Sequence, residues 1–151
     1  MKSISESIEI NAAPSAVFAI VTDLPNMGQY SPENTGGKWL GGVSTAAVGA
    51  KFRGTNAQGK KRWTTLAEVS TCTPDTDFVF RISSFGLPVA TWTYALEATA
   101  TGTKVTETWD DNRFGIMKFF SGLILKDREG FTRTSIHQTL SLMKDHLEAH
   151  S

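Results

Sequence analysis

The sequence is poor in cysteine, has no long apolar run and carries no excess of charge of either sign. Cys72 is the only cysteine among 151 residues, which excludes an internal disulfide and any metal site built from several cysteines. No run of about 20 apolar residues exists that could span a membrane. Fifteen basic residues balance fifteen acidic ones. This balance argues against a nucleic-acid-binding or membrane-surface protein, because both normally carry a basic excess.

The N-terminal residues also lack the apolar stretch that a secretory signal requires. Together with the single cysteine, this predicts a cytoplasmic protein in a reducing compartment. The length, with 40% hydrophobic and 20% charged residues, is typical of one globular domain over residues 1–151. We expect a monomer or a weak homodimer.

The hydrophobic pattern of the first 30 residues predicts a strand followed by a helix. Apolar and polar residues alternate over residues 3–11, which predicts a half-buried strand. Pro14 suits the first position of a helix, where its missing N–H would be unpaired in any case. Because Pro25 restricts the residue before it, this helix should end near Asp23. A second short helical turn is expected at 26–30.

Between residues 38 and 111 the hydrophobic period is two, which predicts a series of strands. Segments rich in Gly, Pro, Asn and Asp interrupt it, and we interpret 31–37, 56–59 and 86–88 as loops or turns. Such short connections favour antiparallel neighbours, because a parallel crossover needs a dozen or more residues. The predicted strands are 38–40, 50–55, 62–71, 77–83, 90–98 and 103–110.

The C-terminal segment returns to a helical period. One apolar stripe predicts a single amphipathic helix over 127–148, consisting of Ile136, Leu140, Met143 and Leu147. Upstream apolar residues follow a different phase, so a kink or a separate short helix is expected before residue 127. The resulting fold class is α+β, with a curved antiparallel sheet of six or seven strands wrapped on the long C-terminal helix and one or two short helices after the first strand.

Several local strings, in their order and spacing, resemble the START-like, polyketide cyclase/dehydrase (SRPBCC) superfamily, which has the helix-grip fold. The matching strings are residues 8–18, Asp23 followed by 30–32, 92–96, 102–106 and 140–148. The resemblance covers nearly the whole chain. It implies a cavity between sheet and helix, but the superfamily includes lipid carriers, ligand receptors, aromatase/cyclases and chaperone activators, so the fold alone does not assign a function.

Large aromatic side chains are the candidate ligand-binding residues. The sequence has nine phenylalanines, four tryptophans and two tyrosines, and many occupy alternate positions of predicted strands. Packing in an ordinary core is one explanation. The resemblance favours a second explanation, an apolar cavity of about 300–1,000 Å³. Its expected lining residues are Trp63, Phe80, Trp92, Tyr94 and Trp109, with Phe120 and Ile124 over the mouth.

Two carboxylates fall on apolar faces of predicted strands. Glu6 stands between Ile4 and Ile8, and Glu107 between Val105 and Trp109. The resemblance makes the first and last strands neighbours, so the two carboxylates are expected near each other. A buried carboxyl has a raised pKa and can act as a general acid or base. Alternatively, a bulge shifts the alternation and each side chain reaches water.

Histidine provides no convincing metal site. His146 and His150 are spaced like ligands on one helix face. However, they stand at the fraying end of the predicted helix and have no obvious third ligand. We therefore expect neither a metal nor another cofactor.

Three functions remain open at this level. The first is binding of a small hydrophobic or amphipathic molecule, such as a lipid, polyketide, isoprenoid or aromatic compound, driven by apolar burial. The second is a cyclase or dehydratase acting on a polyketide-like substrate, with Glu6, Glu107 or a Tyr/Arg pair transferring protons. The third is an interaction protein without a small-molecule ligand.

Overall fold

The computed structural model describes residues 3–115 and 128–149. The predicted order of strand, short helices, strands and long helix is confirmed. The elements in chain order are β1 (Ser3–Ile10), α1 (Pro14–Val21), the 3-10 helix η1 (Leu24–Gln29), β2 (Asn34–Trp39), β3 (Lys51–Gln58), β4 (Lys61–Thr73), β5 (Asp77–Ser84), β6 (Leu87–Ala98), β7 (Thr103–Asp111) and α3 (Arg128–Ala149).

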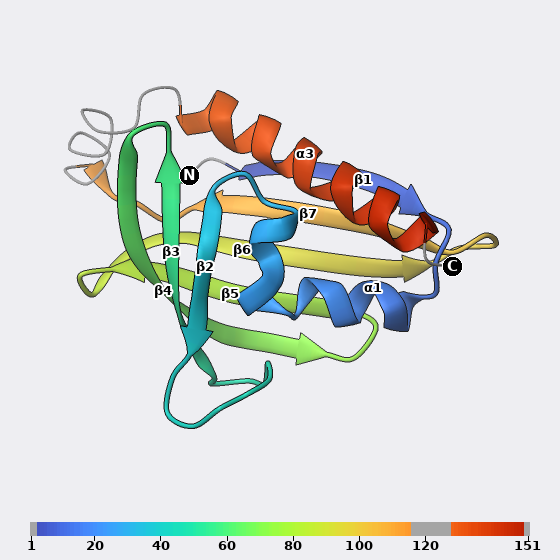
Figure 1. Cartoon of the computed structure of the whole chain (residues 1–151), viewed down its shortest axis with the longest axis horizontal. Helices are drawn as coiled ribbons and strands as arrows, with labels where there is room; N and C mark the ends of the chain where they lie inside the picture. Colours follow the sequence, from blue (N-terminus) through green and yellow to red (C-terminus); the bar gives the residue numbers. More distant parts are fainter. Residues whose placement is uncertain (1–2, 116–127, 150–151) are drawn as a thin grey trace.

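The strands form a seven-stranded sheet in the order β1-β7-β6-β5-β4-β3-β2, and every neighbouring pair is antiparallel. The sheet therefore brings the first and last strands together at one edge. Figure 1 shows the strand direction turning from nearly horizontal in β1 and β7 to vertical in β2 and β3, so that the sheet curves around α3. Such coiling follows from the right-handed twist of its strands.

Helix α3 buries the predicted apolar stripe. Ile136, Leu140 and Met143 are at most 2% exposed and Leu147 is 9% exposed. The helix packs mainly on β1, whereas η1 packs on β2. The same helix also buries a row of hydroxyl-bearing residues, Thr132, Ser135 and Thr139. The inner face of α3 is therefore apolar toward its C-terminus and partly polar toward its N-terminus.

The prediction of a loop through residue 37 is wrong, because β2 begins at Asn34. Gly37, one of the glycines that indicated a loop, allows β3 to approach closely. A Cβ on Gly37 would lie 2.2 Å from the carbonyl oxygen of Arg53 and 2.7 Å from the Phe52 ring. A register shift between Asn34 and Gly36 accommodates the irregular backbone.

Two predicted turns are shifted and shorter in the structure. Strand β3 continues to Gln58 and β6 already begins at Leu87, which leaves two-residue turns at 59–60 and 85–86. Phe85 and Gly86 both have positive φ, 53° and 77°, as in a type I′ turn, whose twist matches that of the flanking strands. Pro88 fits at the start of β6, next to a register shift between Ile82 and Ser83.

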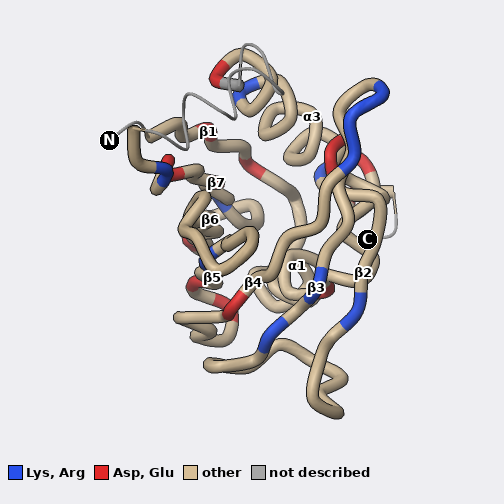
Figure 2. The backbone as a smooth tube through the Cα atoms, turned by 90° about the vertical axis from the view of Figure 1, so that its left-hand side faces the viewer, with Lys and Arg blue, Asp and Glu red and all other residues tan. Residues whose placement is uncertain are grey.

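Charge is distributed unevenly, although the chain as a whole is neutral. Residues 34–67 contain basic side chains and no Asp or Glu. Figure 2 shows basic residues along β2, β3 and the β3–β4 hairpin. These basic residues are Lys38, Lys51, Arg53, Lys60, Lys61 and Arg62. Positive charge is therefore concentrated on the β2–β4 side of the sheet.

No helix among the described residues combines the length and hydropathy needed to cross a membrane.

Candidate functional site

A cavity lies on the concave side of the sheet, between the region covered by α3 and that covered by η1. Strands β3 to β7 contribute its floor, η1 contributes Leu24 and Met27, and α3 contributes Ser135. The cavity arises because α3 packs mainly over β1 at one edge of the sheet and η1 over β2 at the other. The inward side chains of the central strands are left between these two elements.

The cavity has a volume of about 80 Å³, which is smaller than expected. It is also less apolar than expected, because small polar residues share the inner face with large rings. The apolar lining residues are Leu24, Met27, Phe52, Ala67, Phe80, Ile82 and Trp92, with Gly54 between them, and the polar ones are Ser31, Glu33, Asn34, Asn56, Thr65, Tyr94, Glu107 and Ser135. The rings reduce the volume, while the polar groups give the wall an amphipathic character.

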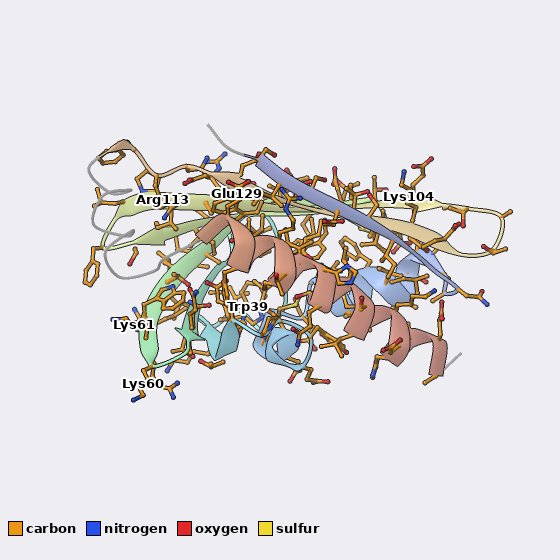
Figure 3. The ribbon with its side chains drawn as sticks, turned by 90° about the horizontal axis from the view of Figure 1, so that it is seen from above. Trp39, Lys60, Lys61, Lys104, Arg113 and Glu129 are labelled. Carbon is orange, nitrogen blue, oxygen red and sulfur yellow. The ribbon has the colours of Figure 1, made fainter. Side chains whose placement is uncertain are left out.

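Strand register brings four of the predicted site residues together. Phe80 of β5 stands opposite Trp92 of β6, and Tyr94 of β6 stands opposite Glu107 of β7. Because side chains alternate along each strand, these four lie on the concave face, and all four line the cavity. On the other side of the cavity, Phe52 is supported by Trp39 at the end of β2 (Figure 3), with the ring centroids 5.2 Å apart in an edge-on arrangement.

The other predicted lining residues are placed elsewhere. Trp63 is half-buried in β4 and Trp109 is almost fully buried in β7, but neither is among the residues lining the cavity. The Arg113 guanidinium lies 6.0 Å from the centroid of the Trp109 ring and pairs with Asp111 at 2.9 Å (Figure 3). Phe120 and Ile124 lie outside the described residues.

Glu107 and Tyr94 form a buried hydrogen-bonded pair in the cavity wall. The Tyr94 hydroxyl donates to Oε2 of Glu107 over 2.9 Å. Burial raises the pKa of Glu107 to about 8, although the hydrogen bond from Tyr94 lowers it in part. Burial also raises the pKa of Tyr94 well above its ordinary value, with a further contribution from the neighbouring Glu107. At neutral pH both side chains therefore carry their protons.

The alternative of a bulge that carries Glu107 to water is wrong. The register of β7 is uninterrupted against both β1 and β6, and Glu107 is 2% exposed. As expected, Glu6 stands directly opposite Glu107. However, its half-buried carboxylate faces α3, where the Arg133 guanidinium lies 3.8 Å away. Glu6 is not among the cavity-lining residues. Glu107 is therefore the only carboxyl of these two that lines the cavity.

The small polar residues of the wall were not predicted from the sequence. Asn56 of β3 donates from Nδ2 to the Thr65 hydroxyl of β4 over 3.0 Å. Strand alternation contained the necessary signal, because Asn56 shares a face with Phe52, and Thr65 shares one with Ala67. Ser135 likewise precedes Ile136 on the buried face of α3. A search of these faces for polar residues would have found all three.

A curved antiparallel sheet closed by a long C-terminal helix, with a cavity between them, defines a helix-grip domain. A family model described as "Polyketide cyclase / dehydrase and lipid transport" matches residues 1–148. The chain belongs to this family, which confirms the resemblance seen in the sequence. None of the curated proteins compared with the chain matches it.

Solved structures with similar folds cover almost the whole chain. A polyketide-cyclase-like protein of Corynebacterium glutamicum is 28% identical, with a TM-score of 0.63 over 98% of this chain and 92% of its own. A START superfamily protein of Mycobacterium smegmatis is 12% identical, with a TM-score of 0.72 over 99% of both chains. The di-domain ARO/CYC StfQ of the steffimycin biosynthetic pathway is 12% identical, with a TM-score of 0.76 over 98% of this chain and 51% of its own. The last two are similar in fold alone.

Proposed function

We propose that this protein binds a small hydrophobic or amphipathic molecule in the cavity between the sheet and α3. The main supporting observation is the composition of the cavity wall. Phe80 and Trp92 provide flat apolar surface, while Tyr94 and Glu107 provide polar groups at one place. Binding sites for small molecules commonly combine an apolar lining with a few polar groups that orient the ligand. Membership of the family is consistent with this function.

The cavity volume limits what can enter without rearrangement. An apolar cavity of about 150 Å³ accepts a benzene molecule, and the cavity here measures about 80 Å³. We therefore propose that it receives one ring or the end of one alkyl chain, with a small outward movement of the wall. The remainder of a lipid, polyketide or isoprenoid would extend beyond the cavity.

Replacing Trp92 by alanine should weaken binding of a one-ring ligand by tenfold or more, because the ring loses a flat apolar contact surface. Trp63→Ala is the matched control, since Trp63 belongs to the same sheet but is not among the lining residues. Its affinity should stay within about threefold of the unmodified protein. Calorimetric titration with acetophenone measures both, at a temperature where melting curves show each variant folded. Equal losses in the two variants, or no saturable binding by the unmodified protein, would contradict the proposal.

A second candidate is a cyclase or dehydratase, and Glu107 is the observation that favours it. A carboxyl with a pKa of about 8 holds a proton at neutral pH and can deliver it to a carbonyl or hydroxyl oxygen. Incubation with a short poly-β-ketone and detection of the cyclised aromatic product by absorbance tests this function. Product that forms with the unmodified protein and not with Glu107→Gln supports catalysis. Equal rates with and without protein exclude it for that substrate.

A further inference from the structure

One carboxyl oxygen in the cavity wall has no hydrogen-bond partner among residues 3–115 and 128–149. The Tyr94 hydroxyl occupies Oε2 of Glu107, whereas Oε1 is buried and has no hydrogen bond within the described part of the chain. A buried polar atom without a partner costs free energy, so such atoms are uncommon in folded proteins. Glu107 also lines the cavity, so a molecule that enters with the outward movement of the wall proposed above can supply the missing hydrogen bond.

The free oxygen is a hydrogen-bond donor at neutral pH. Burial raises the pKa of Glu107 to about 8, so the carboxyl is mainly protonated at pH 7. Since Oε2 accepts the hydrogen bond from Tyr94, the proton is best placed on Oε1. The ligand atom that completes this site is therefore an acceptor.

The charges around the cavity disfavour an anionic ligand. Among the residues that the structure describes, no Lys, Arg or His lines the cavity, whereas two carboxyl groups do, those of Glu33 and Glu107. The Arg133 guanidinium of α3 faces the carboxylate of Glu6 on β1. Burying a carboxylate or phosphate without a cation would carry a large desolvation cost.

We propose that the ligand is an uncharged molecule whose carbonyl oxygen, in a ketone, ester or amide attached to an apolar body, accepts a hydrogen bond from Oε1 of Glu107. This inference rests on the proposed binding function and adds the chemical class of the ligand. Phe80 and Trp92 contact the apolar body, and the Tyr94 hydroxyl holds the carboxyl group in place.

Four one-ring probes of similar size test the ligand class by calorimetric titration at pH 7. They are acetophenone, which has a neutral carbonyl, ethylbenzene, which has no polar group, benzoate, an anion, and benzylamine, a cation. Acetophenone should bind about tenfold more tightly than ethylbenzene, because it gains a hydrogen bond in a buried site. Benzoate should bind more weakly than both. Tighter binding of benzoate or benzylamine than of acetophenone would overturn the inference.

The pH dependence of acetophenone binding tests the role of the proton. Affinity should fall about tenfold between pH 7 and pH 9, as the carboxyl with a pKa of about 8 loses its proton. The groups facing Glu107 are Tyr94 from β6 and Glu6 from β1, with Arg133 of α3 beyond Glu6 and Glu33 on the cavity wall. An affinity that stays constant or rises over this range contradicts the inference.

Two substitutions of Glu107 separate the effect of its hydrogen-bond donor on binding from the effect of its charge. Glu107→Gln keeps an N–H donor and an acceptor for Tyr94. At pH 7 it should bind acetophenone more tightly than a variant without a donor, and its affinity should not fall between pH 7 and pH 9. Glu107→Met has a side chain of similar size and no donor. Its affinity for acetophenone should drop to the affinity of the unmodified protein for ethylbenzene. Strong binding by the methionine variant would overturn the inference.

The titrations distinguish a failure of this inference from a failure of the proposed binding function. If ethylbenzene, benzoate and acetophenone all bind equally well, the cavity binds ligands but the proposed class is wrong. If none of the four probes binds the folded, unmodified protein, the binding function fails and the inference fails with it. The unmodified protein alone decides between these results, whether or not a variant folds.

Discussion

Replacing Glu107 by glutamine should flatten the pH dependence of the protein's stability. The pKa of Glu107 in the folded protein is about 8, against an ordinary value of 4.5. Between these values the folded state binds a proton that the unfolded state has released. The free energy of unfolding should therefore fall as pH rises, by roughly 3–4 kcal/mol between pH 5 and pH 8. Glutamine does not titrate, so this part of the dependence disappears.

Urea unfolding at pH 5, 6, 7 and 8 measures the effect in both proteins. Glu6→Gln provides the matched control, because it removes a half-buried carboxylate directly opposite Glu107. That variant should retain the fall in stability between pH 5 and pH 8. Parallel curves for the unmodified protein and Glu107→Gln would show that the carboxyl of Glu107 does not hold a proton in the folded state at neutral pH.

Leu140→Ala should lower the free energy of unfolding by about 2–5 kcal/mol, because it leaves a cavity where α3 packs on the sheet. Leu140 is 2% exposed and stands in the middle of the buried stripe. Leu142→Ala is the matched control on the same helix, where the side chain is 36% exposed. We expect a change of at most about 0.5 kcal/mol for this variant beyond helix propensity. Chemical denaturation of both variants gives the comparison.

Leu140 is not among the cavity-lining residues, so its truncation also separates stability from binding. Below its melting transition, Leu140→Ala should bind acetophenone as the unmodified protein does. Equal destabilisation by Leu140→Ala and Leu142→Ala would mean that α3 does not pack on the sheet through the face that carries Leu140.

The amphipathic cavity wall relates the two candidate functions to one another. A protonated carboxyl beside aromatic rings can orient a carbonyl ligand by a hydrogen bond. With a suitable substrate, the same group can transfer its proton. We infer that a binding protein and an enzyme would differ here in whether the carboxyl of Glu107 gives up its proton during the bound lifetime of the ligand. The comparison of binding and turnover in Glu107→Gln addresses this point directly.

The regular elements could be predicted because their signals are local. Alternation along 103–110 places Val105, Glu107 and Trp109 on one face without knowledge of any other strand. The stripe from Ile136 to Leu147 likewise predicts the buried side of α3 from its spacing alone. The prediction of a loop through residue 37 failed because glycine occurs both in loops and where two strands approach closely. At Gly37 a residue type that commonly marks a loop instead permits close contact between two strands.

The sequence by itself determined which side of each strand faces inward, because the alternation of side chains is a property of the extended backbone. It therefore identified Phe80, Trp92 and Tyr94 as inward residues and placed Glu107 on an apolar face, with a bulge toward water as the open alternative. Only the tertiary structure decided that these four meet at a cavity while Trp63 and Trp109 do not. The reason is that α3 and η1 pack over opposite edges of the sheet, and the positions of these elements above it depend on contacts between residues far apart in the chain. The same packing places Ser135 in the wall and sets the small volume that the local pattern could not indicate.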